Sequence, residues 1–199
     1  MTALVFLLLG GVILMMRLLP FAAKVHLTHV VLLLRNGESY SRALEEITRT
    51  GQFETPEGRN NTLAALVALL RPDDIMEGFV VSREGDSTPH FAVAAQILAQ
   101  QQLTIAETRP RIPNVTEPPI ISHPDAQNDN FCVVGLVLVA SQAPLRGGDF
   151  TSTQVSLTAL NSLSPQALHF FYTPRPGKRL SRSAAFSLLQ YLRGESTSA

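Results

Sequence analysis

Residues 131–140 read FCVVGLVLVA, an apolar run in which valine and leucine predominate and no side chain is charged. A half-buried strand alternates apolar and polar residues, whereas an unbroken run of this length is typical of a strand covered on both faces. We therefore place this segment at the centre of a β-sheet and expect helices against the sheet.

A second buried strand is predicted over Val25–Leu34 (VHLTHVVLLL), because β-branched residues and leucine fill it and the turn signal Asn36-Gly37 follows it. The alternative is a helix that continues from the apolar residues before it.

Helical and strand periodicities alternate through the rest of the chain. The expected elements are a helix around Tyr40–Ile47, a helix capped by Thr55-Pro56-Glu57 and stopped by Pro72, a strand over Gly78–Arg83, a helix over Phe91–Gln102, a helix over Thr151–Leu163, a strand over Ala167–Thr173 and a last helix capped by Ser181. This order predicts an α+β (mixed α/β) fold: one domain over residues 25–199, with a mixed sheet of about four strands covered by helices.

The N-terminal residues form an apolar segment. From Thr2 to Met16 no side chain is ionisable, and Thr2–Ala23 contains only Arg17 as a charge. As a helix, this stretch would span about 33 Å, enough for a hydrocarbon core of about 30 Å. We expect a transmembrane anchor over residues 1–24. Basic residues follow the apolar core rather than precede it, which disfavours a cleaved signal peptide or a buried core helix and keeps the C-terminal side in the cytoplasm.

The charge balance limits the kinds of partner. Sixteen Lys and Arg residues match sixteen Asp and Glu residues, so the net charge is zero, which argues against a nucleic-acid binder. Charged residues make up 16% of the chain and the mean hydropathy is +0.15, in keeping with a membrane-associated protein. The single cysteine, Cys132, excludes an intramolecular disulfide.

Residues Thr104–Asn130 lack periodicity and contain five of the thirteen prolines. Proline alternating with isoleucine and valine gives a semi-rigid extended chain that loses little entropy on docking. We interpret this loop as a partner-contact segment; the alternative is an insertion without consequence. The contact residues proposed from the sequence are Ile112, Pro113, Pro118, Pro119 and Ile120.

Two further segments carry groups that bind anions. The turn Arg146-Gly147-Gly148 precedes a predicted helix, where backbone N–H groups and the arginine favour an anion, although Asp149 is a natural N-cap that would repel a phosphate. The four cations Arg175, Lys178, Arg179 and Arg182 lie within eight residues and are suited to anionic headgroups. The alternatives are an ordinary glycine-containing connection and a solvated loop.

The sequence contains no G-x-G-x-x-G, P-loop, H-E-x-x-H, G-x-S-x-G or C-x-x-C motif. His26 and His29 are three apart, which on a strand sends them to opposite faces and disfavours a metal site. Cys132 opens an apolar strand, where a thiol is usually packed, and His123 and Asp125 flank a proline as in a turn. We therefore predict no catalytic residues, no metal and no cofactor.

Several short motifs resemble a known family. Thr55-Pro56-Glu57-Gly58 opens a leucine-rich helix that ends in Leu69-Leu70-Arg71-Pro72, the strand near the C-terminus closes with Tyr172-Thr173-Pro174, and Leu180-Ser181 opens a helix that contains Tyr191. Over residues 25–193, this pattern resembles the cyanobacterial and chloroplast family catalogued as domain of unknown function fifteen-seventeen. Here a proline-rich segment replaces that family's charged middle stretch, and tyrosine replaces tryptophan before the Thr-Pro pair.

The resemblance implies a membrane-anchored protein of photosynthetic organisms, of a kind linked in plastids to acclimation to changing light, without an established catalytic activity. The resemblance, together with the apolar N-terminus and the proline-rich segment, favours an interaction module. We expect this module on the cytoplasmic or stromal side of a thylakoid or plasma membrane. Its expected partners are membrane lipid, through the N-terminal helix, and a membrane-protein complex. The alternative is a small-ligand or phosphate-binding enzyme or sensor that uses the Arg146–Asp149 turn.

Overall fold

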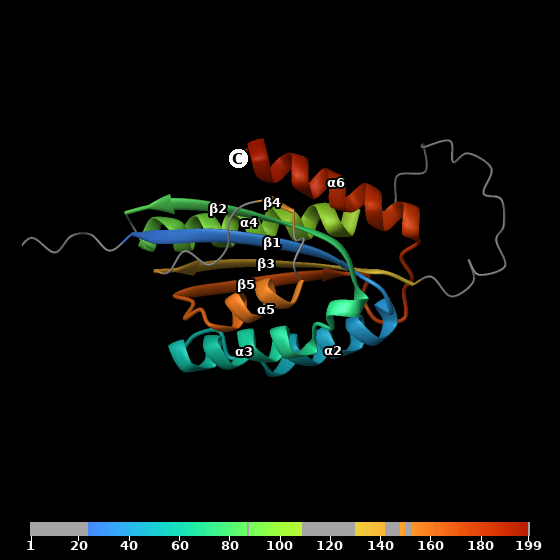
Figure 1. Cartoon of the computed structure of the whole chain (residues 1–199), viewed down its shortest axis with the longest axis horizontal. Helices are drawn as coiled ribbons and strands as arrows, with labels where there is room; N and C mark the ends of the chain where they lie inside the picture. The colour runs from blue at the N-terminus through green and yellow to red at the C-terminus, as the bar shows by residue number, and fades with distance from the viewer. Residues whose placement is uncertain (1–23, 87, 109–129, 142–147, 150–152, 199) are drawn as a thin grey trace, which may run out of the picture.

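The computed structural model describes residues 24–86, 88–108, 130–141, 148–149 and 153–198, and in these ranges five strands form one sheet with the order β4-β2-β1-β3-β5 (Figure 1). The elements are β1 (Val25–Leu34), α2 (Gly37–Thr50), α3 (Pro56–Leu69), a 3-10 turn η1 (Pro72–Asp74), β2 (Ile75–Gly85), α4 (Thr88–Thr108), β3 (Cys132–Ala140), β4 (Gly148–Asp149), α5 (Thr153–Asn161), β5 (Ala167–Thr173) and α6 (Arg182–Ser198).

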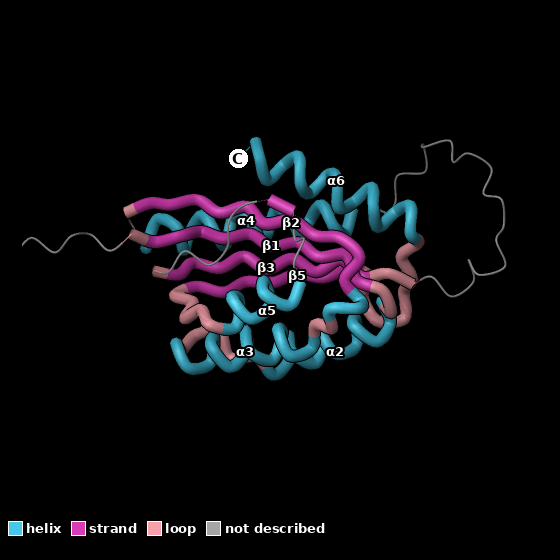
Figure 2. Tube along the Cα trace, viewed as in Figure 1, coloured by secondary structure: helices cyan, strands magenta, loops and turns pink. Residues whose placement is uncertain are grey.

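The two apolar runs form neighbouring strands inside the sheet. Strand β1 pairs with β2 on one side and with β3 on the other, and β3 also pairs with β5 (Figure 2). The predicted strands at Val25–Leu34 and 131–140 are therefore confirmed, and the alternative of a helix through residues 25–34 is wrong. Their burial on both faces explains why neither run alternates with polar residues.

The expectation of a mixed sheet is wrong in one respect, because every neighbouring pair in the described sheet is antiparallel. Strands β2 and β3 run parallel to each other and are joined by the helix α4, but β1 lies between them. A strand-helix-strand pattern predicts parallel strands, and it does not reveal that a third strand separates them.

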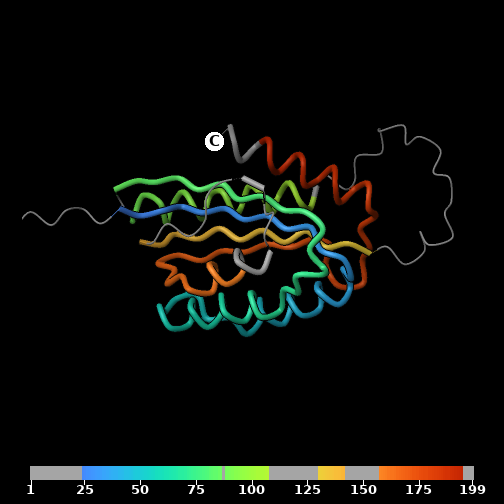
Figure 3. The backbone as a smooth tube through the Cα atoms, in the orientation of Figure 1, coloured from blue at the N-terminus to red at the C-terminus, as the bar shows by residue number. Residues whose placement is uncertain are grey.

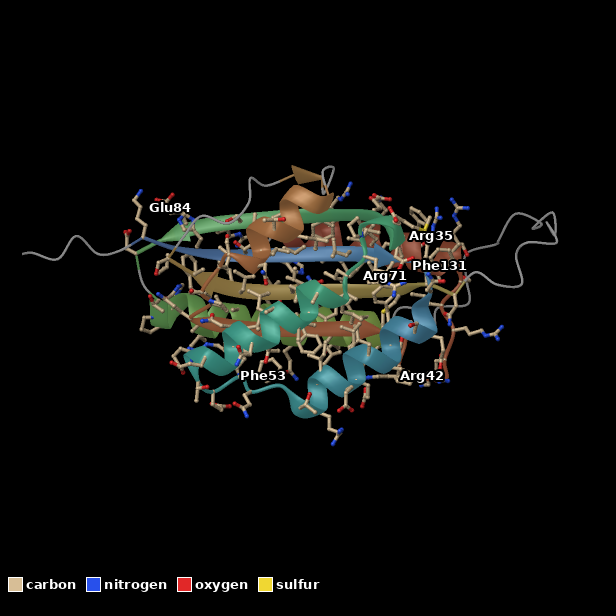
Figure 4. The ribbon with its side chains drawn as sticks, turned by 60° about the horizontal axis from the view of Figure 1, so that its bottom comes forward. Arg35, Arg42, Phe53, Arg71, Glu84 and Phe131 are labelled. Atoms are coloured by element: carbon tan, nitrogen blue, oxygen red, sulfur yellow. The ribbon has the colours of Figure 1, made fainter. Side chains whose placement is uncertain are left out.

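Helices cover both faces of the sheet. Helices α2, α3 and α5 lie on one face, and α4 and α6 lie on the other (Figures 1 and 4). Alternate residues of β1 point to opposite faces of the sheet. Leu32 and Leu34 belong to the core under α2, α3 and α5. Val31 and Leu33 belong to the core under α6 and the end of α4. The period of two in a strand produces this division.

Local signals set several helix boundaries. The Thr55 hydroxyl accepts a hydrogen bond from the Gly58 N–H at 3.0 Å, and the Ser181 hydroxyl accepts one from the Ala184 N–H at 3.3 Å, so both predicted N-caps are confirmed. Helix α4 is longer than predicted and extends to Thr108, into the stretch assigned to a loop. Packing explains the extension, because Ala106 is completely buried against the core beside α6.

The predicted anchor over residues 1–24 lies, except for Lys24, outside the described residues. None of the helices in the described ranges combines the length and the hydrophobicity needed to cross a bilayer.

The two ends of the sheet differ in what they carry. At the entry end, where the chain enters β1, Val25 pairs with Gly85 and His26 with Ala140; at the far end, Leu34 pairs with Cys132. Ten strand residues at about 3.3 Å each separate the ends by about 30 Å. Figure 3 shows the strands running between the two ends, and Figure 4 shows Glu84 at the entry end with Arg35 and Phe131 at the far end.

Candidate functional site

His26 and His29 lie on opposite faces of β1. His29 is 2% exposed and lies edge-on to Phe79, with ring centroids 5.7 Å apart, whereas His26 is part-exposed on the opposite face of β1. Burial lowers the pKa of His29 to about 4, so its imidazole is neutral at neutral pH. Within the described ranges, no three His, Cys, Asp or Glu side chains gather closely enough to hold a metal ion.

Cys132 lies at the start of β3 and is completely buried. Burial raises the pKa of its thiol to about 12, which makes the thiolate scarce and the side chain a poor nucleophile. His123 and Asp125, which flank Pro124 in the predicted turn, lie outside the described residues.

Part of the predicted anion turn belongs to the sheet. Gly148 and Asp149 form the short strand β4, which pairs with Val80 and Phe79 of β2. Arg146 and Gly147 lie outside the described residues, so the predicted anion site stays a prediction from the sequence.

The first cation of the basic run is held within the protein. The Arg175 guanidinium lies 3.4 Å from the Glu45 carboxylate and 3.6 Å from that of Glu107, and it stacks over the Tyr172 ring at 5.0 Å. The Tyr172 hydroxyl donates to Glu45, and burial raises the pKa of this phenol to about 12. Arg175 thus joins the end of β5 to α2 and α4.

The other cations of the run, Lys178, Arg179 and Arg182, are exposed at the far end. Arg182 also stacks over the Phe186 ring at 5.7 Å. These three side chains lie about 30 Å along the sheet from Lys24, where the predicted anchor would join the domain. Dissolved salt screens the attraction between these cations and anionic headgroups beyond about 8 Å. The three side chains therefore reach headgroups near the anchor only if the strands lie along the membrane surface.

The partner-contact residues Ile112, Pro113, Pro118, Pro119 and Ile120 lie outside the described residues, but both flanks of their segment are described. At one flank, Glu107 near the end of α4 pairs with Arg175. At the other, the Asn130 carbonyl accepts from the Gly37 N–H at 2.7 Å and the Phe131 N–H donates to the Leu180 carbonyl at 3.1 Å. The segment therefore leaves and rejoins the domain at the far end.

A cavity that the sequence analysis missed lies nearer the entry end, between β1, β2 and α4. Its volume is about 280 Å³, and its floor consists of the cross-strand pairs Leu27–Arg83 and His29–Val81. One stripe of α4 forms its wall: Ala94, Ile97, Leu98 and Gln101. The available signal was Val93 and Ile97, four apart in a predicted helix; they are 57% and 52% exposed and are the exposed large hydrophobic residues among those described.

The chain matches no protein-family model, no curated protein and no solved structure in the comparisons made.

Proposed function

We propose that the protein is a membrane-anchored interaction module: residues 1–24 hold it in the bilayer as a single pass, and the far end of the domain binds a membrane-protein complex on the cytoplasmic or stromal side. One observation supports this proposal above the others. The attachment point of the apolar segment and the two flanks of the proline-rich segment lie at opposite ends of one sheet.

The connection at the entry end is short. Lys24 is followed directly by Val25, which is 1% exposed and already paired with Gly85 of β2. Because β1 has strand partners on both sides, Lys24 alone separates the apolar sequence 1–23 from the middle of the sheet. The domain would therefore stand in a restricted orientation close to the bilayer.

The far end offers the groups that a protein partner requires. The flanks of residues 109–129 are fixed in the core through Ala106 and Phe131, which are 0% and 2% exposed. Lys178 and Arg179 lie exposed on the same end. Fixed flanks restrict the free chain and reduce the entropy lost on docking, and the cations favour a partner with an acidic surface.

Carbonate extraction and a pull-down from mildly solubilised membranes test the two halves of the proposal. We expect the full chain to stay in the pellet and to co-purify with a membrane complex. Replacing residues 109–129 with a short Gly/Ser loop should abolish co-purification while the protein stays in the pellet. Lys178→Gln with Arg179→Gln should weaken co-purification, and the control Arg49→Gln, an exposed arginine in the last turn of α2, should not.

Release of the full chain by carbonate would refute the anchor. If the loop variant still co-purified with the complex, residues 109–129 would not be the partner contact, and the interface would have to lie on the helices.

A further inference from the structure

We propose that the cavity between β1, β2 and α4 binds a single-chain anionic amphiphile, with the alkyl chain against Leu27, Val81 and Leu98 and the anionic head at Arg83. The inference deepens the proposed function and rests on it in one respect, because a nearby bilayer supplies such molecules.

The lining of the cavity is chemically asymmetric. Five of its eight lining side chains, Leu27, Val81, Ala94, Ile97 and Leu98, are aliphatic. His29 is neutral at neutral pH, so Arg83 is the one lining side chain that carries a charge there. An apolar space with a single cation at one side matches a ligand that has an apolar body and one anionic group.

The position of Arg83 also fits an anionic head. Arg83 lines the cavity and is an exposed residue, and it pairs with Leu27 of β1, which is three residues along the chain from Lys24. A guanidinium presents several donors to a carboxylate or phosphate. Glu84, the neighbouring acid, pairs with Lys24, and adjacent strand residues point to opposite faces, so this acid does not oppose the head.

The size of the cavity favours one chain. An apolar cavity of about 150 Å³ accommodates benzene, and pockets for drug-sized ligands begin at about 300 Å³. A space of about 280 Å³ therefore holds one alkyl segment and excludes the two chains of a diacyl lipid side by side.

Apolar surface continues outward from the cavity. Ile97 belongs to both the cavity wall and the exposed surface, and Val93, one turn earlier on α4, extends the apolar strip toward the entry end. On the other face of the sheet the core is closed by α2, α3 and α5. An amphiphile leaving a bilayer near Lys24 would meet Val93 and Ile97 before it reached the cavity.

The test uses the full chain in nanodiscs of zwitterionic phosphatidylcholine and a fatty acid with a diazirine in its alkyl chain. After illumination, we expect peptides of β1, β2 and α4 to carry the label. When affinity is referred to the free aqueous concentration of each acid, saturated fatty acids should bind about fourfold more tightly per added methylene until the chain fills the cavity, and then level off. Simple partition into the bilayer would not level off in this way.

Two variants locate the parts of the ligand. Ala94→Trp fills the cavity and should abolish labelling, whereas Gln96→Trp, exposed on the same helix and outside this cavity, should not. Arg83→Gln should lower the affinity for a fatty acid about fivefold and leave that for the alcohol of equal length unchanged, as expected for loss of an exposed charge pair. Lysophosphatidate as competitor distinguishes a lipid phosphate from a free carboxylate as the source of the anion.

Protection of Cys132 from a thiol reagent reports that each variant is folded, because this thiol is buried in the core. Labelling that survives Ala94→Trp in a folded protein would overturn the inference, and so would affinity that does not depend on Arg83. Crosslinks between residues 1–23 and α4 would identify the chain's own segment as the occupant and would also overturn it. Carbonate extraction of the same variants separates these outcomes from failure of the anchor, since filling the cavity does not remove residues 1–24.

Discussion

Acid should destabilise the domain through His29. The imidazole is 2% exposed and lies beside the rings of Phe79 and Phe171, with centroids 5.7 and 6.4 Å away. Burial lowers its pKa from 6.5 to about 4. At a pH between these two values the imidazole is protonated in the unfolded chain and neutral in the folded protein. Between pH 6.5 and 4 the unfolded state therefore binds more protons, and the free energy of unfolding falls as the pH falls through this window.

The size of the effect follows from the two pKa values. At about 1.4 kcal/mol per pKa unit, the difference amounts to about 3 kcal/mol, most of it lost by pH 4.5. This is a large share of the stability of an ordinary domain, about 5–15 kcal/mol. His169, whose pKa half-burial also lowers, adds a loss of the same sign.

Urea unfolding of residues 24–199, followed by circular dichroism from pH 7.5 to 4.5, measures this loss. His29→Gln removes the titrating group and should flatten the pH dependence over this range by most of the ~3 kcal/mol, that is, by about 2 kcal/mol or more. The matched control His26→Gln, on the opposite face of the same strand, should keep it. Equal pH dependence in the wild type and His29→Gln would refute the reasoning.

Three further results are expected. Removing residues 1–23 should leave a soluble, cooperatively folding domain, because β1 begins at Val25; aggregation on size-exclusion chromatography would contradict this. Gly37→Ala should lower the free energy of unfolding by about 2 kcal/mol or more, because the new methyl meets the Phe131 carbonyl, whereas Gly194→Ala in α6 meets no atom and should be neutral or stabilising by up to about 1 kcal/mol in the same urea assay. Cys132 should resist alkylation at neutral pH until urea unfolds the protein; rapid labelling of the folded protein would show an accessible, activated thiol.

The sequence was most informative where one residue type decides a local conformation. The caps at Thr55 and Ser181 and the apolar runs of β1 and β3 were predicted because each follows from side chains near in sequence. The antiparallel order was not predictable, because it depends on β1 lying between β2 and β3. The last turn of α4 escaped detection because Ala106 is stabilised by distant residues.

Some features of the candidate site also followed from local sequence, whereas others depended on contacts between distant segments. The placement of His26 and His29 on opposite faces of β1 followed from their spacing of three on a strand. The cavity was not predictable, because it arises where a stripe of α4 fails to fill the space above two cross-strand pairs. The participation of Gly148 in an edge strand depended on β2, almost seventy residues earlier.

The way the chain enters the sheet has a mechanical consequence. A pull on Lys24 along β1 loads the hydrogen bonds to β2 and β3 together, in shear, over the ten residues of the strand. A pull from the C-terminus first meets α6 and then β5, which lies at the edge of the sheet and can be peeled away one hydrogen bond at a time. A processive protease would therefore unravel the domain with less force from its C-terminus than from the N-terminal end of β1.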